Sequence, residues 1–254
     1  MFLLLSPAKK MHATPLTLPK GIDTQSPHFL SKTEQIATVM KEQSVQELKK
    51  MMGLSDSLAN LNFDRFQNFQ IPSSEDIGAP AASMFAGDTY VGLQAQGFTK
   101  EDWEFAKDRV GILSGLYGLL GLTDRIQPYR LEMGTKIHIQ DQILVKYWKG
   151  ILGRYLAQEI PTTEVIVNLA SQEYFAAIDR DKLTNHSIIT PLFQEYRKGE
   201  YKTISFSAKQ ARGTMARYVI QNRLCDCESM KNFTEDGYQY QESLSDAHTW
   251  VFTR

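Results

Sequence analysis

Apolar residues follow two spacings along the chain, one typical of strands and the other typical of helices. Short runs of consecutive apolar residues predict strands that are buried on both faces. Apolar residues that recur every three or four positions predict helices that pack through one face. The predicted strands are residues 2–5, 110–113, 165–169, 188–196, 201–206, 238–242 and 249–252. The predicted helices are residues 31–52, 55–66, 100–109, 141–158 and 208–224.

Capping and turn signals refine this outline. Ser44 followed by Glu47 is a capping-box signature, which divides the first helical stretch into two helices. Thr99 with Asp102 marks the start of the third predicted helical segment in the same way. Residues 197–200 separate two strand-like runs and predict a hairpin.

Strands and helices mix without a strict strand–helix–strand repeat, and the chain has no internal repeat. We therefore expect an α/β fold with a mixed β-sheet and surrounding helices, in one domain over residues 1–254. Residues 31–69 would form a small helical insertion, and residues 70–83 a surface loop. The glycine-rich residues 113–120 predict a tight loop after a strand, with a short helix as the alternative.

Composition excludes disorder and any global positive field. The 254 residues are 42% hydrophobic and 11% aromatic, enough to bury a substantial core. Lys and Arg total 28 and Asp and Glu total 29, so the formal net charge is −1. Any nucleic-acid binding must therefore come from a local basic patch.

The cysteines and the apolar segments indicate the cellular location of the protein. The two cysteines, Cys225 and Cys227, are too close in sequence to bridge each other readily, and this usage fits a reducing cytosol. The apolar start, residues 1–5, is short and has no basic residue before it, unlike a signal peptide. No stretch approaches the roughly 18 apolar residues of a membrane span. We expect a cytoplasmic protein with no membrane partner.

The loop after the first predicted strand is the first candidate site. Ser6, Lys9 and Lys10 follow that strand directly. Loops at the carboxyl ends of strands are where α/β proteins bind ligands, and a hydroxyl with two ammonium groups suits a phosphate. An ordinary polar loop is the alternative.

Two further segments combine polar and charged residues. Asn168, Ser171 and Glu173 lie at the exit of the strand over 165–169, although Ser171 could simply cap the next turn. Arg130 and Glu132 lie on one face if the chain there is extended. The arginine suits a phosphate, and the glutamate could act as a general base or pair with the arginine structurally.

The helix predicted over 208–224 is basic over most of its length. Lys209 and Arg212 share one side, whereas Arg217 is about 140° from Arg212. Gly213 indicates a close approach of another backbone, because glycine inside a helix costs about 1 kcal/mol relative to alanine. A solvated basic face is the alternative to a phosphate site.

The turn between the second and third predicted helices resembles a helix-hairpin-helix. The backbone amides of such a hairpin bind a DNA phosphate without reading bases. Gly53 occupies the usual first glycine, Ser55 replaces the second, and Asp56 adds a negative charge at the tip.

Known cofactor and metal motifs are absent from the sequence. The five histidines lack metal-ligand spacing, and the two cysteines have no matching second pair. The chain has no phosphate-binding Walker loop, no G-x-G-x-x-G and no G-x-S-x-G. We therefore expect no cofactor and no metal.

Six segments spread over almost the whole chain occur together, in the same order, in one known family. They are residues 4–9 (LLSPAK), 85–93 (FAGDTYVGL), 113–118 (LSGLYG), 127–134 (QPYRLEMG), 168–175 (NLASQEYF) and 209–213 (KQARG). The chain therefore resembles the YaaA family of bacterial peroxide-stress proteins. That family usually has Arg-Pro-Leu-Asp after the Leu-Tyr-Gly segment. This chain has Gly121-Leu-Thr-Asp124 and keeps only the acid, which puts any ligand-binding role of that arginine in doubt here.

The resemblance implies an α/β domain of unusual topology with a basic cleft. It also implies a cytosolic role in limiting oxidative damage, linked to keeping free intracellular iron low. Members of the family look like double-stranded DNA binders with a helix-hairpin-helix.

Two functional hypotheses follow. The first is a DNA-binding protein whose cleft contains Ser6, Lys9, Lys10, Arg130, Asn168, Ser171, Lys209, Arg212 and Arg217, with Gly53 and Ser55 as a second phosphate contact. The second is an enzyme that acts on a nucleotide or a nucleic-acid base, with Glu132 or Glu173 as general acid or base in glycosidic-bond chemistry and a nucleotide or nucleoside as its ligand. A carboxylate in a closed pocket beside the basic groups would favour the enzyme, and a shallow basic groove would favour the binder.

Overall fold

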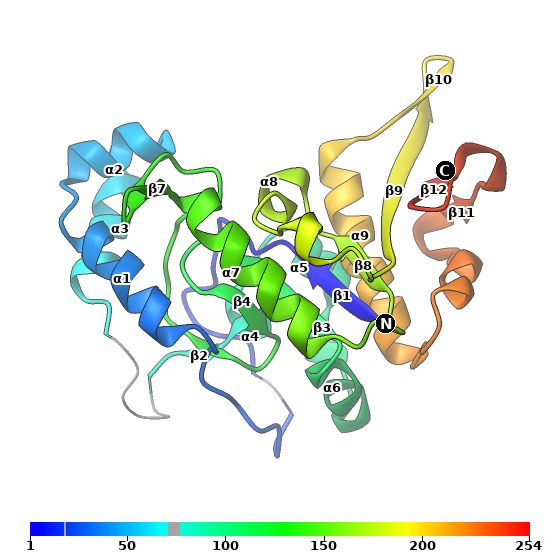
Figure 1. The fold of residues 1–254 in the computed structure, drawn as a ribbon, viewed down its shortest axis with the longest axis horizontal. Helices are drawn as coiled ribbons and strands as arrows, with labels where there is room; N and C mark the ends of the chain where they lie inside the picture. The colour runs from blue at the N-terminus through cyan, green and yellow to red at the C-terminus, as the bar shows by residue number, and fades with distance from the viewer. Residues whose placement is uncertain (18, 71–76) are drawn as a thin grey trace.

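A mixed eight-stranded sheet forms the centre of the protein in the computed structural model, which describes residues 1–17, 19–70 and 77–254. The strand order is β11-β12-β9-β8-β1-β3-β4, and β10 pairs with β9 (Figure 1). The five strands β12, β9, β8, β1 and β3 run parallel, whereas β4, β10 and β11 are antiparallel to their neighbours. The strands are β1 (Phe2–Leu5), β3 (Val110–Ser114), β4 (Gly118–Gly121), β8 (Ile166–Leu169), β9 (Ile188–Arg197), β10 (Glu200–Lys202), β11 (Gln239–Tyr240) and β12 (Thr249–Thr253).

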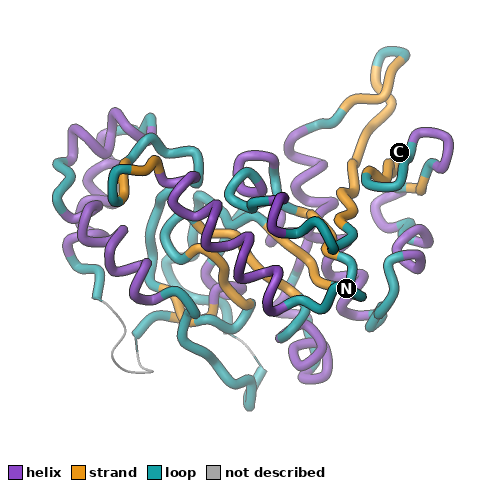
Figure 2. The backbone as a smooth tube through the Cα atoms, viewed as in Figure 1, coloured by secondary structure: helices purple, strands orange, loops and turns teal. Residues whose placement is uncertain are grey.

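Helices cover both faces of this sheet. In Figure 1, α7 crosses in front of the sheet, α9 lies behind it, and α1 to α3 gather at one end of the molecule. Figure 2 shows the same arrangement, with the β9–β10 hairpin projecting from the sheet. The helices are α1 (Leu30–Lys41), α2 (Val45–Met52), α3 (Asp56–Gln67), α4 (Ala81–Met84), α5 (Asp88–Leu93), α6 (Lys100–Lys107), α7 (Leu144–Glu159), α8 (Gln172–Phe175) and α9 (Ser205–Gln221). Short 3₁₀ turns and two small two-stranded sheets, β2 (Ala79–Pro80) with β5 (Arg125–Ile126) and β6 (His138–Ile139) with β7 (Gln142–Ile143), complete the fold.

Most predicted elements are confirmed, including both capping boxes at Ser44 and Thr99 and the hairpin at 197–200. The alternative helix over 113–120 is wrong, because this stretch continues β3 and turns into β4. The strand predicted over 201–206 ends at Lys202, since α9 begins at Ser205, three residues earlier than predicted. The surface loop predicted over 70–83 ends in β2 and α4, and residues 71–76 of it lie outside the described residues.

The core is built on β1. Leu3, Leu4 and Leu5 are fully buried, because β1 pairs with a strand on each edge and is covered on both faces. The parallel pairing of β1 with β8 also brings the ends of these two strands together, with Leu5 opposite Leu169. The loops that carry the predicted phosphate ligands therefore begin side by side.

Two glycines allow α5 to lie directly against α9. A Cβ atom at Gly213 would lie 1.7 Å from the carbonyl oxygen of Thr89, and one at Gly92 would lie 2.1 Å from that of Gln210. No side chain fits at either position, which confirms the close approach predicted for Gly213. This contact holds the start of α5 beside the basic part of α9.

In the parts of the chain that the structure describes, no helix is both long enough and apolar enough to cross a membrane.

Substitution of Gly213 tests this packing. We expect Gly213→Ala to lower the free energy of unfolding by about 1–3 kcal/mol or more, because the new methyl group must push two backbones apart. Gly150→Ala in α7 is the matched control, since nothing lies within 4 Å of its Cβ position. That control should stabilise the protein by up to about 1 kcal/mol. Urea unfolding measures both, and equal effects would contradict the packing role of Gly213.

Candidate functional site

A pocket of about 350 Å³ lies where β1 and β8 end, between α5, α8 and α9. It collects most of the residues predicted as phosphate ligands. Those that line it are Ser6, Lys9, Lys10, Ser171, Lys209 and Arg212, and Glu173, predicted as a general acid or base, lines it as well. The segments that supply these residues lie far apart in the sequence. Ser6 and Ser171, which are in contact, are separated by 165 positions. We call this the basic pocket.

The serines form a joint between the two strand ends. The Ser171 backbone N–H donates to Ser6 Oγ at 2.9 Å, and the two hydroxyl oxygens lie 3.4 Å apart. The Tyr90 hydroxyl donates to the Ser6 carbonyl oxygen at 3.1 Å. Ser171 occupies the N-cap position of α8, but its hydroxyl makes no capping hydrogen bond. The side chain of Ser171 is therefore used in the pocket rather than in the helix.

Three cations of the basic pocket lack an acidic partner. Among the described residues, no carboxylate lies within ion-pair distance of Lys10, Lys209 or Arg212. Lys10 and Lys209 are exposed, whereas Arg212 is half-buried and its Nε has no hydrogen-bond partner. Burial lowers the pKa of Arg212. An anion in the pocket would satisfy this guanidinium.

Glu132 occupies a small cavity that adjoins the basic pocket through Lys9. Its Oε1 accepts from Arg130 Nε at 3.0 Å and forms ion pairs with Arg130 Nη2 at 3.0 Å and with Lys9 Nζ at 3.1 Å. The structural pairing of Arg130 with Glu132 is therefore formed. The other oxygen, Oε2, is buried and has no hydrogen-bond partner.

Uncharged tyrosines line the basic pocket and the small cavity at Glu132. Burial raises the pKa of Tyr90, Tyr129 and Tyr174 above its usual value, so all three stay protonated at neutral pH. The Tyr129 hydroxyl is hydrogen-bonded to Ser114 at 2.6 Å. The tyrosines thus provide flat apolar surface beside the charged groups.

Two predicted residues have mainly supporting contacts. Glu173 is exposed, and its Oε1 accepts from the Gly134 N–H at 3.1 Å, which ties α8 to the segment that carries Arg130. Asn168 is buried, accepts from the Ala170 N–H at 3.0 Å and does not line the pocket.

Three other predicted residues lie elsewhere. The Arg217 guanidinium is bound by Glu235 on another side of α9. Gly53 and Ser55 form the turn between α2 and α3, at the end of the molecule that holds the helical insertion (Figure 1). Gly53 has φ +61°, and Ser55 caps α3 by accepting from Leu58 N at 3.4 Å.

The start of α5 also lines the basic pocket, and residue types in the sequence do not predict this. Asp88, Thr89 and Tyr90 line it. In the sequence these three residues belong to the segment 85–93, which is shared with the YaaA family, and nothing in their spacing connects them to the basic residues. Their contribution depends on the packing of α5 against α9. Among the described residues, no three His, Cys, Asp or Glu side chains are grouped as metal ligands.

The sequence is similar to known proteins along its full length. The family model of the peroxide stress protein YaaA matches residues 1–244. The chain belongs to this family. It is 42% identical to a UPF0246 protein of Hahella chejuensis and 43% identical to one of Colwellia psychrerythraea. Each alignment covers all of this chain and 99% of the relative. The family supports a role in peroxide stress.

Proposed function

We propose that this protein acts in peroxide stress by binding double-stranded DNA through the basic pocket. In this proposal the protein acts in the cytoplasm, where it limits oxidative damage and the amount of free iron. The observation that carries the DNA-binding proposal is the group formed by Lys10, Lys209 and Arg212, which have no acidic partners among the described residues of a chain with net charge −1.

The chemistry of these groups suits phosphate. A guanidinium fork and two ammonium groups around one hollow match the oxygens of a backbone phosphate. Arg212 gains most, because its half-buried guanidinium lacks a partner for Nε in the free protein. Contacts of this kind do not read bases, so binding would be independent of sequence and would weaken steeply with salt.

Neutralising the pocket tests this proposal. We expect the double variant Lys209→Ala/Arg212→Gln to bind duplex DNA more weakly and to reduce the slope of log affinity against log salt by about 2, since each lost phosphate contact contributes about 0.9. Fluorescence anisotropy over about 50–200 mM salt measures both quantities.

Arg217→Gln is the matched control, because it removes one charge from the same helix at a residue already paired with Glu235. Its salt slope should stay close to that of the unaltered protein. A double variant with unaltered affinity and slope would exclude the basic pocket as the DNA surface.

We propose the α2–α3 turn as a second phosphate contact. Gly53 ends α2 in the left-handed conformation and Ser55 begins α3, so the backbone N–H groups at the start of α3 lie at the tip of the turn. Asp56 at this tip is paired with Lys49 at 2.7 Å. That carboxylate opposes a phosphate directly and also occupies a lysine that could bind one.

Removing the Asp56 charge tests this contact. We expect Asp56→Asn to raise duplex affinity by about twofold or more, because it frees Lys49 and removes repulsion at the tip. Asp64→Asn makes the same charge change further along α3 and is the control for general charge. If both variants change affinity equally, the turn is not a DNA contact.

A second candidate is an enzyme that cleaves the glycosidic bond of a nucleotide or nucleoside. The observation that favours it is Glu132 Oε2, a buried carboxylate oxygen without a partner beside two cations. The cations would hold the phosphate, the tyrosines would pack on the base, and Glu132 would transfer a proton.

This candidate predicts turnover that depends on Glu132. We expect the protein to release free base from at least one member of a panel of nucleosides and nucleotides, with the released base measured by chromatography. The rate of release should fall by about 100-fold or more in Glu132→Gln. Glu173→Gln is the control, since Glu173 is exposed and holds a backbone amide. No base release from any substrate, or the same activity in Glu132→Gln as in the unaltered protein, would exclude this enzyme and leave DNA binding as the remaining proposal.

A further inference from the structure

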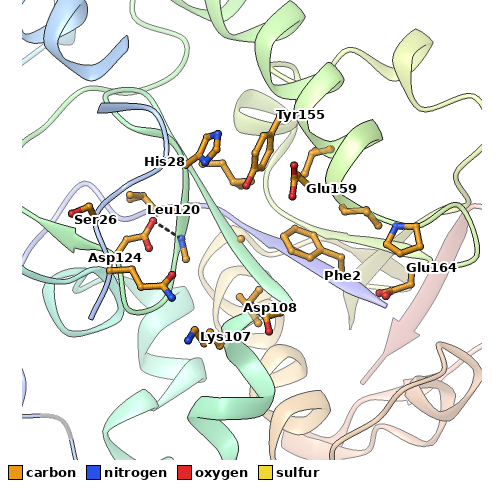
Figure 3. Close-up of a pocket in the computed structure, with 18 residues that line it drawn as sticks. Phe2, Ser26, His28, Lys107, Asp108, Leu120, Asp124, Tyr155, Glu159 and Glu164 are labelled. Carbon is orange, nitrogen blue, oxygen red and sulfur yellow. Dashed lines mark hydrogen bonds between the residues drawn. The ribbon is translucent and has the colours of Figure 1, made fainter. Parts of the chain in front are cut away.

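A cavity of about 460 Å³ lies between the β3–β4 edge of the sheet and α7, and the DNA-binding proposal makes no use of it. None of the residues that line it belongs to the basic pocket. Figure 3 shows the cavity with Asp124 at one end, His28 and Tyr155 together on one side and Phe2 facing them. We call it the acidic cavity because carboxylates outnumber cations around it.

Two glycines lie in the wall of this cavity. Gly111 and Gly121 are paired across β3 and β4, and both line the cavity. The three heavy atoms nearest to a Cβ at Gly121 would all belong to the carboxyl group of Asp124, with Oδ1 at 3.2 Å. Because Gly121 has no side chain, nothing from that residue covers this side of Asp124.

Asp124 is a buried carboxylate without a counter-charge. The residue is 6% exposed, and its Oδ2 accepts from the Gly121 N–H at 2.9 Å. Within the described residues, Oδ1 has no hydrogen-bond partner and no cation lies within ion-pair distance. Burial raises the pKa of Asp124 to about 7, although the hydrogen bond from the Gly121 N–H opposes this shift.

The remaining charges around the cavity are mostly negative. Asp108 and Glu159 lie on its rim, and Glu164 is paired with the N-terminal ammonium at 3.0 Å. Lys107 is the one lysine or arginine among the described residues that line it. This environment repels phosphate and attracts cations.

Part of the cavity wall is apolar and aromatic. The rings of His28 and Tyr155 lie 4.5 Å apart, and Phe2, Leu119 and Leu120 line the sheet side. A cavity of this size holds a small organic molecule, and aromatic faces beside a carboxylate suit a cation that carries an apolar body.

We propose that the acidic cavity is a second ligand site, which binds a small organic cation with its charged nitrogen group on Asp124 and its apolar body between Phe2 and the His28–Tyr155 pair. A planar amidinium or guanidinium head would donate to Oδ1 and leave the Gly121 hydrogen bond to Oδ2 in place. The site is independent of the DNA-binding proposal.

Two matched probes test the charge requirement on the unaltered protein. Benzamidine is a planar cation, and benzamide is a neutral molecule of nearly the same shape. We expect isothermal titration calorimetry to show saturable binding of benzamidine and at least about tenfold weaker binding of benzamide. No saturable binding of benzamidine, or equal affinity for the two probes, would overturn the proposal.

Variants locate the binding. Asp124→Asn keeps an acceptor for Gly121 N–H but removes the charge, and Gly121→Arg places a cation and a long side chain beside Asp124. Each should weaken benzamidine binding by about tenfold or more, and Glu159→Gln on the exposed rim should weaken it less. Thermal unfolding confirms that each variant is folded. Should Asp124→Asn fail to fold, Gly121→Arg and the two-probe comparison decide.

The two sites should respond separately. Lys209→Ala/Arg212→Gln should leave benzamidine binding unchanged, and Asp124→Asn should leave the salt dependence of DNA binding unchanged. Unaltered benzamidine affinity in both Asp124→Asn and Gly121→Arg would place the probe elsewhere and refute the acidic cavity as its site.

Discussion

The parallel pairing of β1 with β8 is the interaction on which the functional part of the molecule depends. It fixes Leu5 opposite Leu169, so that the chain leaves both strands at the same edge of the sheet. Ser6 and Ser171 then meet directly after the strands and join the two loops by a 2.9 Å hydrogen bond. The basic residues of the first loop and the polar residues of the second are neighbours for this reason, and not because of their sequence spacing.

The close contact of α5 with α9 supplies the opposite wall. Because Gly92 and Gly213 carry no side chains, the two backbones approach closely enough for α9 to place Arg212 over the strand ends. A half-buried guanidinium without a carboxylate partner is costly in a free protein, since the desolvation of the charge is not offset. The architecture stabilises Arg212 in a position where it contributes little to folding, which is typical of a residue kept for ligand binding.

Local patterns predicted the elements well, and tertiary contacts decided the site. Runs of apolar residues located the strands, and the capping boxes at Ser44 and Thr99 located helix starts, because both signals act over a few residues. The DNA-binding hypothesis assigned Arg217 to the same cleft as Arg212 despite their separation on the helix, and Glu235, 18 residues further along, binds Arg217 instead. The acidic cavity was also beyond prediction, since it depends on Gly121, Asp124 and α7 meeting in space.

Opposite charges on two parts of one sheet explain how a chain of net charge −1 can present a cationic pocket. Carboxylates gather beside β3 and β4, while the cations without acidic partners gather at the ends of β1 and β8. Asp88, Glu173 and Glu132 are exceptions, because they lie beside these cations, and Glu132 binds both Lys9 and Arg130. Glu132 lowers the positive charge available to an anion, yet its second oxygen stays buried and unsatisfied. A purely structural ion pair would be expected to satisfy both oxygens, so this carboxylate is the group that most directly separates a phosphate-binding surface from a catalytic pocket.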